Sequence, residues 1–299
     1  MLKKFLYSIN FIKFRKITFS FSIILSVIAI LLIYYKGINL NIDFTGGVNI
    51  ELKNNNYDIT KIRNILEEHN FVGSSVTLFN QENISIKIGS NNANLNDIVL
   101  NLKSILSDNI SKNIEYLQVE VIGAQVGSDL ISSSIMALIL SFLGIMIYIW
   151  IRFEWQFGLG VLVSLLHDAL ICLGFISLFQ IEFNISSIAA ILTVIGYSVN
   201  DSVVIYDRIR ENIRIIRSQK LSVIINNSLH QTLSRTTLTV FTTVLANLAI
   251  VLFGGATIFP FAILVLFGFI FGTYSSIFIS APFLLLFIKE DKYITKTTL

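Results

Sequence analysis

The sequence has little of what most soluble enzymes and metalloproteins depend on. Only 14% of its 299 residues are charged, against about 25% in soluble globular proteins, which argues against an ordinary soluble enzyme. Its single cysteine, Cys172, excludes an intrachain disulfide and a cysteine-based metal cluster. The three histidines, His69, His167 and His230, are scattered, so we expect no metal site and no cofactor. The net charge of +3 forms no basic stripe with interleaved aromatics, so nucleic acid is not expected as a partner.

Long apolar runs dominate the rest of the chain, in which 54% of residues are hydrophobic. A stretch of about 20 apolar residues spans the hydrocarbon core of a bilayer. The first run has an apolar core of about 19 residues with no small-residue cleavage site after it, so we interpret it as a retained anchor and not as a signal peptide. We expect six transmembrane helices, at 17–35, 131–151, 156–179, 184–206, 233–253 and 260–288.

Lysine and arginine gather at one side of these predicted spans. They cluster in 1–16, in 207–232 and in 289–299, whereas the opposite short loops, 180–184 and 254–259, contain none. Such charges stay on the cytoplasmic side of short loops. The sequence therefore predicts a multi-pass protein with a cytoplasmic N-terminal segment, 1–16, and a cytoplasmic C-terminal segment, 289–299.

The segment 36–130 is then a long domain on the outer, periplasmic side, and it holds 18 of the 41 charged residues. The alternation of Val48, Ile50 and Leu52 indicates a strand. The order of expected elements is βαββαβ, the ferredoxin-like arrangement, which predicts a small α+β domain that grips or binds without chemistry. The remaining elements are expected as helices at 59–66 and 94–107 and as strands at 74–79, 83–89 and 114–122.

Few ionisable side chains fall inside the predicted spans. Each costs at least about 2.5 kcal/mol at the centre of a span, so such residues usually mark a pathway. Asp201 and Arg235 are expected to meet at similar depth in the cytoplasmic half. Asp168, beside His167, is expected nearer the midplane, where it serves either a proton pathway or helix packing.

The surroundings of Asp201 and Arg235 are polar, because Ser198 and Asn200 precede the aspartate and Thr239 follows the arginine by one helical turn. Desolvation favours a protonated carboxyl and a nearby arginine favours the ionised form. A small movement of Arg235 can therefore switch the aspartate between binding and releasing a proton. The alternative is a structural ion pair that locks two helices together.

Two other features of the apolar runs are assigned to structure. Gly268 and Gly272 form a GxxxG motif, which is typical of close helix packing. Pro260 stands where the sixth span begins, and proline is favoured in the first turn of a helix. We expect no chemistry from either feature.

Four stretches together resemble the SecF family of bacterial protein-export membrane proteins. Their order and spacing agree with the family over nearly the whole chain, whereas GAQVGSDL at 123–130 only approximates the family sequence at that point. The four stretches are NIDFTGG at 41–47, SLLHDALICLGFISLF at 164–179, GYSVNDSVVIYDRIREN at 196–212 and LSRTTLT at 233–239.

This resemblance implies a bacterial inner-membrane subunit that is half of a twelve-helix unit of the RND type, completed by SecD. The family uses proton-motive force to complete the export of unfolded preproteins after ATP-driven threading through SecYEG, and YidC and YajC are further candidate partners. Asp201 and Arg235 would belong to the proton path. Asp43, Gly46 and Gly47 would shape the junction between the first span and the outer domain.

Three other classes of function remain open at this point. An RND-type exporter of small molecules or lipids would share the proton site, although about 90 outer residues make only one small domain. A purely structural assembly subunit would need no ionisable pair, so an inert Asp201→Asn variant would favour it. An intramembrane aspartyl protease is disfavoured, because Asp201 lacks the GxGD that this chemistry needs. No GxxxxGK[ST] motif occurs, and we expect no enzymatic activity.

Overall fold

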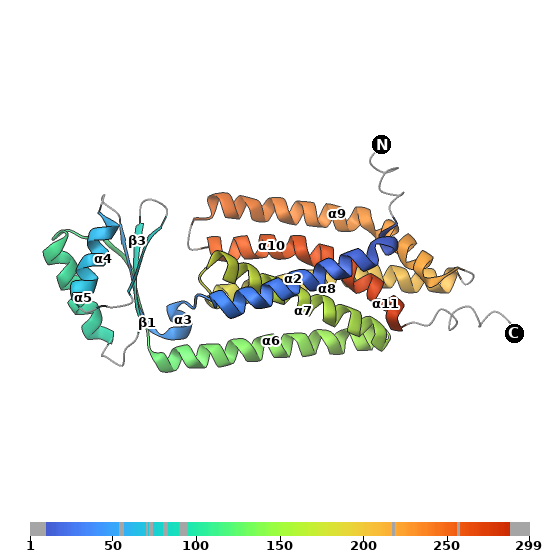
Figure 1. Ribbon diagram of the computed structural model, residues 1–299, viewed down its shortest axis with the longest axis horizontal. Coiled ribbons are helices and arrows are strands. Elements are labelled where there is room, and N and C mark those ends of the chain that lie inside the picture. Colours follow the sequence, from blue (N-terminus) through green and yellow to red (C-terminus); the bar gives the residue numbers. More distant parts are fainter. Residues whose placement is uncertain are drawn as a thin grey trace.

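The structure, a computed structural model, describes residues 10–53, 57–69, 71, 74–79, 83–89, 95–216, 219–255 and 258–287. Most of the predicted N-terminal segment and all of the predicted C-terminal segment 289–299 lie outside these residues. The chain forms a long helical bundle with a small sheet domain at one end (Figure 1). We call the two ends of the bundle the sheet end and the far end.

The sheet domain has the element order that the periodicity predicts. Its strands lie in the order β2-β3-β1-β4, and every neighbouring pair is antiparallel. This is the ferredoxin-like order, because β3 lies between β1 and β2, the two strands that α4 connects along the chain. The predicted βαββαβ fold is confirmed. The elements are β1 (Gly47–Lys53), α4 (Ile59–Glu68), β2 (Ser75–Phe79), β3 (Asn83–Gly89), α5 (Leu95–Asn109) and β4 (Tyr116–Ile122).

The two faces of this sheet differ in character. Ile50 and Ile86 are fully buried on one face, against Leu66 of α4 and Leu106 of α5. The other face is polar and faces the bundle, because α4 and α5 cover only the face of the sheet that points away from the bundle (Figure 1). From this polar face Lys87 forms an ion pair with Glu182 in the loop between two bundle helices. A cleft of about 470 Å³ lies between the polar face and the sheet end of the bundle.

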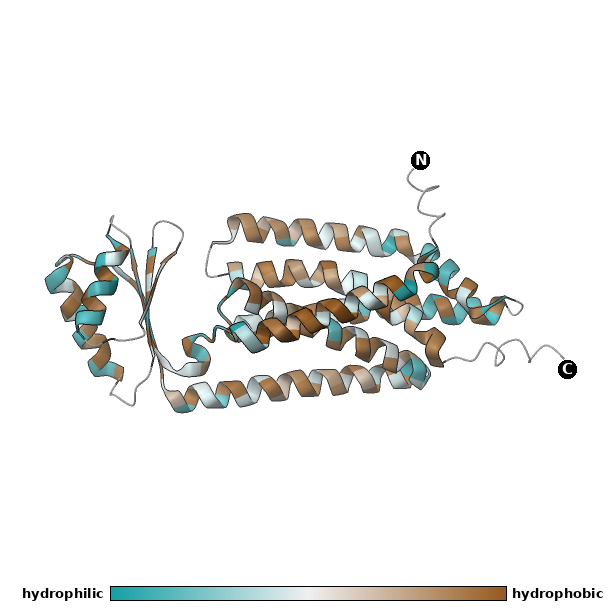
Figure 2. Cartoon of the chain, in the orientation of Figure 1, coloured by the Kyte–Doolittle hydropathy of each residue, from teal (hydrophilic) through white to brown (hydrophobic). Residues whose placement is uncertain are grey.

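The described part of the bundle holds six helical segments long and apolar enough to cross a membrane, as the sequence predicts. Figure 2 shows hydrophobic residues along these helices and hydrophilic ones in the sheet domain and at the far end. The helices are η1 (Phe11–Phe14) with α2 (Arg15–Lys36), α6 (Ala124–Arg152), α7 (Trp155–Phe179), α8 (Ile185–Ile215), α9 (Leu221–Phe253), and α10 (Phe259–Ser275) with the π-helical turn η2 (Ser276–Ser280) and α11 (Ala281–Phe287).

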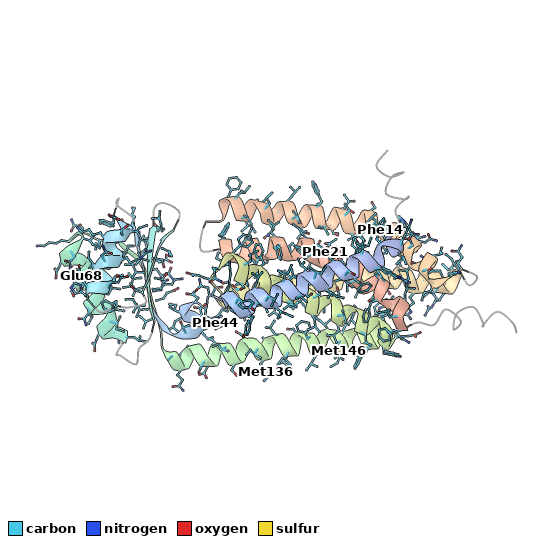
Figure 3. All side chains as sticks on the ribbon, viewed as in Figure 1. Phe14, Phe21, Phe44, Glu68, Met136 and Met146 are labelled. Atoms are coloured by element: carbon cyan, nitrogen blue, oxygen red, sulfur yellow. The ribbon has the colours of Figure 1, made fainter. Side chains whose placement is uncertain are left out.

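Three of these helices are inner and three are peripheral. In the apolar windows of α7, α8 and α10, half or more of the residues are buried, whereas in α2, α6 and α9 only about a tenth or fewer are. Phe14 at the end of η1, Phe21 on α2 and Met136 on α6 lie at the surface of the bundle, 46%, 49% and 55% exposed (Figure 3). The inner helices therefore supply the core, and the peripheral helices present apolar surface to lipid or to another chain.

The structure differs from the sequence analysis between the fourth and fifth spans. The segment 207–232, expected to be a cytoplasmic loop, is mostly helical, because α8 continues to Ile215 and α9 already begins at Leu221. The two extensions hold each other through polar side chains: Asn212 donates to the hydroxyl of Ser228 at 2.8 Å. Charged residues mark the end of the apolar span, but they do not end a helix.

Both features that the sequence assigned to structure are confirmed. Pro260 stands in the first turn of α10. A Cβ atom at Gly268 would lie 2.1 Å from Cγ2 of Val194, and one at Gly272 would lie 3.3 Å from Cβ of Ser198. The GxxxG motif thus lets α10 pack directly on α8.

Candidate functional site in the helical bundle

Asp168 lies at the middle of α7 and is fully buried. Its Oδ2 accepts hydrogen bonds from the hydroxyls of Ser198 on α8 and Ser275 on α10, each at 2.7 Å. Nδ1 of His167 lies 3.1 Å from its Oδ1. Ser164, one turn earlier on α7, donates to the hydroxyl of Ser275 at 2.9 Å. This polar cluster, which we call the Asp168 cluster, joins all three inner helices.

A line of buried hydroxyls continues from this cluster along α8 toward the far end. The Ser202 hydroxyl donates to that of Ser276 at 3.2 Å, and Ser276 also bonds the carbonyl of Ser198. The hydroxyls of Tyr206 and Ser280 are 2.6 Å apart. Ser276 and Ser280 are the first and last residues of the π-helical turn η2. Ser198 was among the residues that the sequence pointed to, but Tyr206, Ser276 and Ser280 were not, although the spacing of Ser198, Ser202 and Tyr206 by four residues was a signal of one polar helix face.

Asp201 and Arg235 lie at similar depth, as the sequence predicts. Asp201 is 16 residues, about 24 Å, from the start of α8 at Ile185, and Arg235 is 18 residues, about 27 Å, from the end of α9 at Phe253. Both helix ends lie at the sheet end of the bundle (Figure 1). Arg235 was expected near the start of its helix, but α9 begins at Leu221, so the arginine lies well inside the helix.

The two side chains approach each other without forming a close ion pair. Asp201 is only 3% exposed, and its Oδ2 has no hydrogen-bond partner. Arg235 is exposed and acts on Asp201 electrostatically. Among the described residues, neither takes part in an ion pair within 4.0 Å. The site therefore contains a buried acceptor atom and an exposed arginine that is held apart from it.

The polar residues expected around this pair are not gathered on it. Asn200 is exposed, and Thr239 donates to the carbonyls of Arg235 and Thr236 on its own helix, at 3.0 Å each. Thr236, which the sequence analysis missed, is 2% exposed and its hydroxyl has no partner. The unpartnered atoms near this depth therefore come from Asp201 and Thr236.

The predicted junction residues connect the sheet domain to the bundle. Asp43 lies in a short helix, α3 (Ile42–Thr45), and its Oδ2 accepts the backbone N–H of Ile185 at the start of α8, at 3.1 Å. The ring of Phe44, labelled in Figure 3 between the two parts, lies 5.5 Å from that of Phe183. The NIDFTGG stretch thus attaches to the loop between α7 and α8.

Both glycines of this stretch are required by their positions. Gly46 and Gly47 have φ angles of +70° and +145°, which side chains other than glycine rarely adopt. A Cβ at Gly46 would lie 2.9 Å from Cα of Ala124, and one at Gly47 would lie 2.2 Å from the carbonyl oxygen of Ile88. The chain can turn from α3 into β1 here only because both residues carry a hydrogen atom in place of a side chain.

Metal chemistry finds no support in this arrangement. Over the described ranges, no three His, Cys, Asp or Glu side chains come together in a way that would hold a metal ion. What the site offers instead is one hydrogen-bonded carboxyl, one unpartnered carboxyl oxygen and an arginine.

Comparison with known proteins identifies the family. The model of the C-terminal part of the protein export membrane proteins SecD and SecF matches residues 102–290. A protein translocase subunit SecF from Rickettsia bellii is 51% identical over 284 residues, covering 94% of both chains. The chain belongs to the SecD/SecF family. A SecF from Rickettsia prowazekii is 50% identical over 281 residues, covering 93% of this chain and 90% of that protein.

Solved SecDF structures share the fold. A crystal structure of SecDF from Thermus thermophilus, described as a translocon-associated membrane protein, matches with a TM-score of 0.84 and 32% identity, covering 93% of this chain. SecDF in a super-membrane-facing form matches with a TM-score of 0.67 and 31% identity. The chain spans only 38% of the length of each SecDF chain.

These comparisons confirm the resemblance, the fold class and the assignment to the protein translocase. The chain is a multi-pass membrane protein of the SecF type, a protein translocase subunit. Its relatives do not favour the alternative of a small-molecule or lipid exporter. The roles of the individual site residues are a separate question.

Proposed function

We propose that the chain is the SecF half of a SecD–SecF unit in the bacterial inner membrane, which uses proton-motive force to complete the export of preproteins that have been threaded through SecYEG. YidC and YajC are additional candidate partners. The names of its relatives and its 38% share of the SecDF chain support this proposal. The unit works by binding and movement, and the proposal assigns no covalent reaction to this chain.

A polar surface inside the membrane supports pairing with a SecD-type chain. Thr193 and Asn200 on α8 and Arg235 and Thr242 on α9 are all exposed in this chain. An arginine that faces lipid costs at least about 2.5 kcal/mol at the centre of a bilayer, and Arg235 lies inside its span, toward the far end. This surface is therefore better suited to a polar protein partner than to lipid, and the proposed partner lies beside α8 and α9.

The distribution of charge supports a cytoplasmic far end. Arg152, Arg208, Arg210 and Arg214 lie there, at the ends of α6 and α8. By the positive-inside rule this end faces the cytoplasm, and the sheet domain then lies in the periplasm. The polar face of the sheet looks back toward the membrane, where it is positioned to respond to movements of the bundle.

The proton site proposed within this chain is Asp201 with Arg235. The observation that carries the proposal is the buried Oδ2 of Asp201, which has no hydrogen-bond partner and can therefore receive a proton without breaking a contact. A movement of α9 that changes the distance of Arg235 would change the stability of the charged carboxylate. One proton crossing 100 mV supplies about 2.3 kcal/mol, which is enough to shift the balance between two conformations.

Asp168 and His167 we assign to helix packing. Both oxygens of this carboxyl already have partners, so a proton moving on or off would disturb contacts among three helices. Ser198 belongs to the same packing cluster, and Asn200 and Thr239 to the partner-facing surface.

The test is the release of a slowly exported reporter protein from energised cells that carry Asp201→Asn. Asp207→Asn is the matched control, because Asp207 lies on the same helix but is only half-buried and pairs with Arg152 at 3.1 Å. We expect the first variant to reach the membrane in normal amount, to lose the part of release that an uncoupler abolishes in the parent, and the control to keep it. Normal uncoupler-sensitive release in Asp201→Asn would overturn the proton role and favour a scaffold.

A further inference from the structure

A cavity of about 500 Å³ opens at the far end of the bundle, between the start of α2 and the start of α9. On one side it is lined by Lys13 of η1 and by Arg15 and Lys16 of α2. Lys220 lines it from the turn that precedes α9. None of its lining residues is a carboxylate. Within the described part of the chain, none of these four cations has an ion-pair partner within 4.0 Å.

A second basic cavity at the same end provides a comparison. It has a volume of about 290 Å³ and is lined by Arg152, Arg210 and Arg214, but Glu154 also lines it, and Arg152 pairs with Asp207 at 3.1 Å. Its positive charge is therefore largely compensated inside the chain. The cavity at the start of α2 holds four positive charges that nothing in the described chain neutralises.

The position of the first cavity combines charge with apolar surface. Phe14 and Ile17, beside the basic side chains on the first helix, are 46% and 67% exposed, and the apolar part of α2 follows directly. Basic side chains at such a boundary attract the anionic surface of a membrane. The cavity also adjoins the N-terminus of the 33-residue helix α9, where Lys220 supplies no side-chain capping bond, and helix N-termini favour anions.

We propose that this cavity binds a phosphate-bearing anion, and that its source is the headgroup of an acidic phospholipid. Lys13 and Lys220 contact the phosphate from the two helices, while Phe14 and Ile17 lie along the acyl chains. Since α2 and α9 are both peripheral, such a lipid would tie their ends together. This site is independent of the proposed proton function.

The test is lipid binding by the purified full-length chain in detergent, followed by native mass spectrometry with three probes: phosphatidylglycerol, phosphatidylcholine and inorganic phosphate. The double variant Lys13→Gln with Lys220→Gln removes one cation from each helix. The matched control, Arg210→Gln with Arg214→Gln, removes two cations from the compensated cavity at the same end. Lys13→Arg with Lys220→Arg keeps the charge and shows whether the site tolerates substitution.

We expect phosphatidylglycerol to bind in preference to phosphatidylcholine. The loss of two cations should weaken its binding by about tenfold or more, since each is worth about 1 kcal/mol near an anionic surface, while the control pair and the arginine pair retain it. Inorganic phosphate binding that the double variant loses would support the anion site but assign it to a free phosphate. Equal binding of both lipids, or an equal loss in the control pair, would overturn the proposal.

Discussion

The bundle contains two buried aspartates that differ in their hydrogen-bond partners. Asp168 is surrounded by donors from three helices, and both its oxygens are satisfied. Asp201 is nearly as buried but has an oxygen with no partner, and Arg235, the cation that acts on it, is exposed. Buried polar groups are normally hydrogen-bonded, so the carboxyl of Asp168 is complete within the chain and that of Asp201 is not.

We propose that this difference separates a structural role from a functional one. A satisfied polar cluster fixes the register of the helices that build it, and the Asp168 cluster joins α7, α8 and α10. An unsatisfied carboxyl beside an exposed arginine has a contact still to make, with a proton, with water or with a partner chain. On this argument the Asp201 site is half of a site, consistent with a chain that matches 38% of SecDF.

The largest effect that would test the comparison is the truncation of each aspartate. Asp168→Ala should lower the free energy of unfolding by about 3 kcal/mol, because Ser198, Ser275 and His167 lose a buried acceptor. Asp201→Ala should lower it by less than about 1 kcal/mol, since its Oδ2 has no partner to lose. Unfolding of the purified chain by increasing SDS in mixed micelles measures both.

Asp168→Asn refines this result, because it keeps an acceptor oxygen and should lose less than the alanine variant. Equal losses for Asp168→Ala and Asp201→Ala would remove the distinction between a complete and an incomplete region.

A smaller effect is expected from two glycines, one in the contact between α10 and α8 and one on α8 away from any contact. A Cβ at Gly272 of α10 would lie 3.3 Å from Cβ of Ser198 and 3.7 Å from Oδ2 of Asp168. Gly272→Ala should therefore push α10 away from α8 and cost about 1 to 2 kcal/mol. Gly196→Ala is the matched control, because a Cβ there meets nothing within 4 Å. The same SDS titration compares them, and a Gly272→Ala chain as stable as the control would show that this interface is loose.

The predictable part of this molecule is the part with a strong local signal. Apolar runs gave six spans, and alternation in segments such as Val48 to Leu52 gave the order of the sheet domain. Asp168, Asp201 and Arg235 were found because an ionisable residue in an apolar run is rare. Their depths followed from the rise of a helix, so the approach of Asp201 and Arg235 was also predictable.

The rest depends on contacts between helices. Ser275, Ser276 and Ser280 complete the polar region beside α8, but serine is common wherever helices pack closely, so nothing marked these three in the sequence. The π-helical turn that contains Ser276 and Ser280 arises from packing and has no local signal. The helical extensions in 207–232 were missed because charge was read as the end of a helix as well as the end of the apolar span.

The smallest expected effect extends the comparison to a carboxyl outside the bundle, on the polar face of the sheet. Burial, with a further contribution from the charge of Glu120, raises the pKa of Glu51 above its usual value. A raised pKa means that the ionised form is disfavoured in the folded state. The resulting loss of stability is present at neutral pH and disappears as the pH falls through the raised pKa toward the usual value.

Glu51→Gln should therefore stabilise the chain at pH 7 to 8 by less than about 0.5 kcal/mol, because the group is only partly buried and solvent screens its interactions. The gain should vanish in acid. Thermal unfolding of the parent and the variant across this pH range measures it, with Glu115→Gln as the control, since Glu115 is exposed and pairs with Lys53 at 3.1 Å. A gain that persists in acid would show that the substitution acts through packing, and Glu51 would then resemble Asp168 in role more than Asp201.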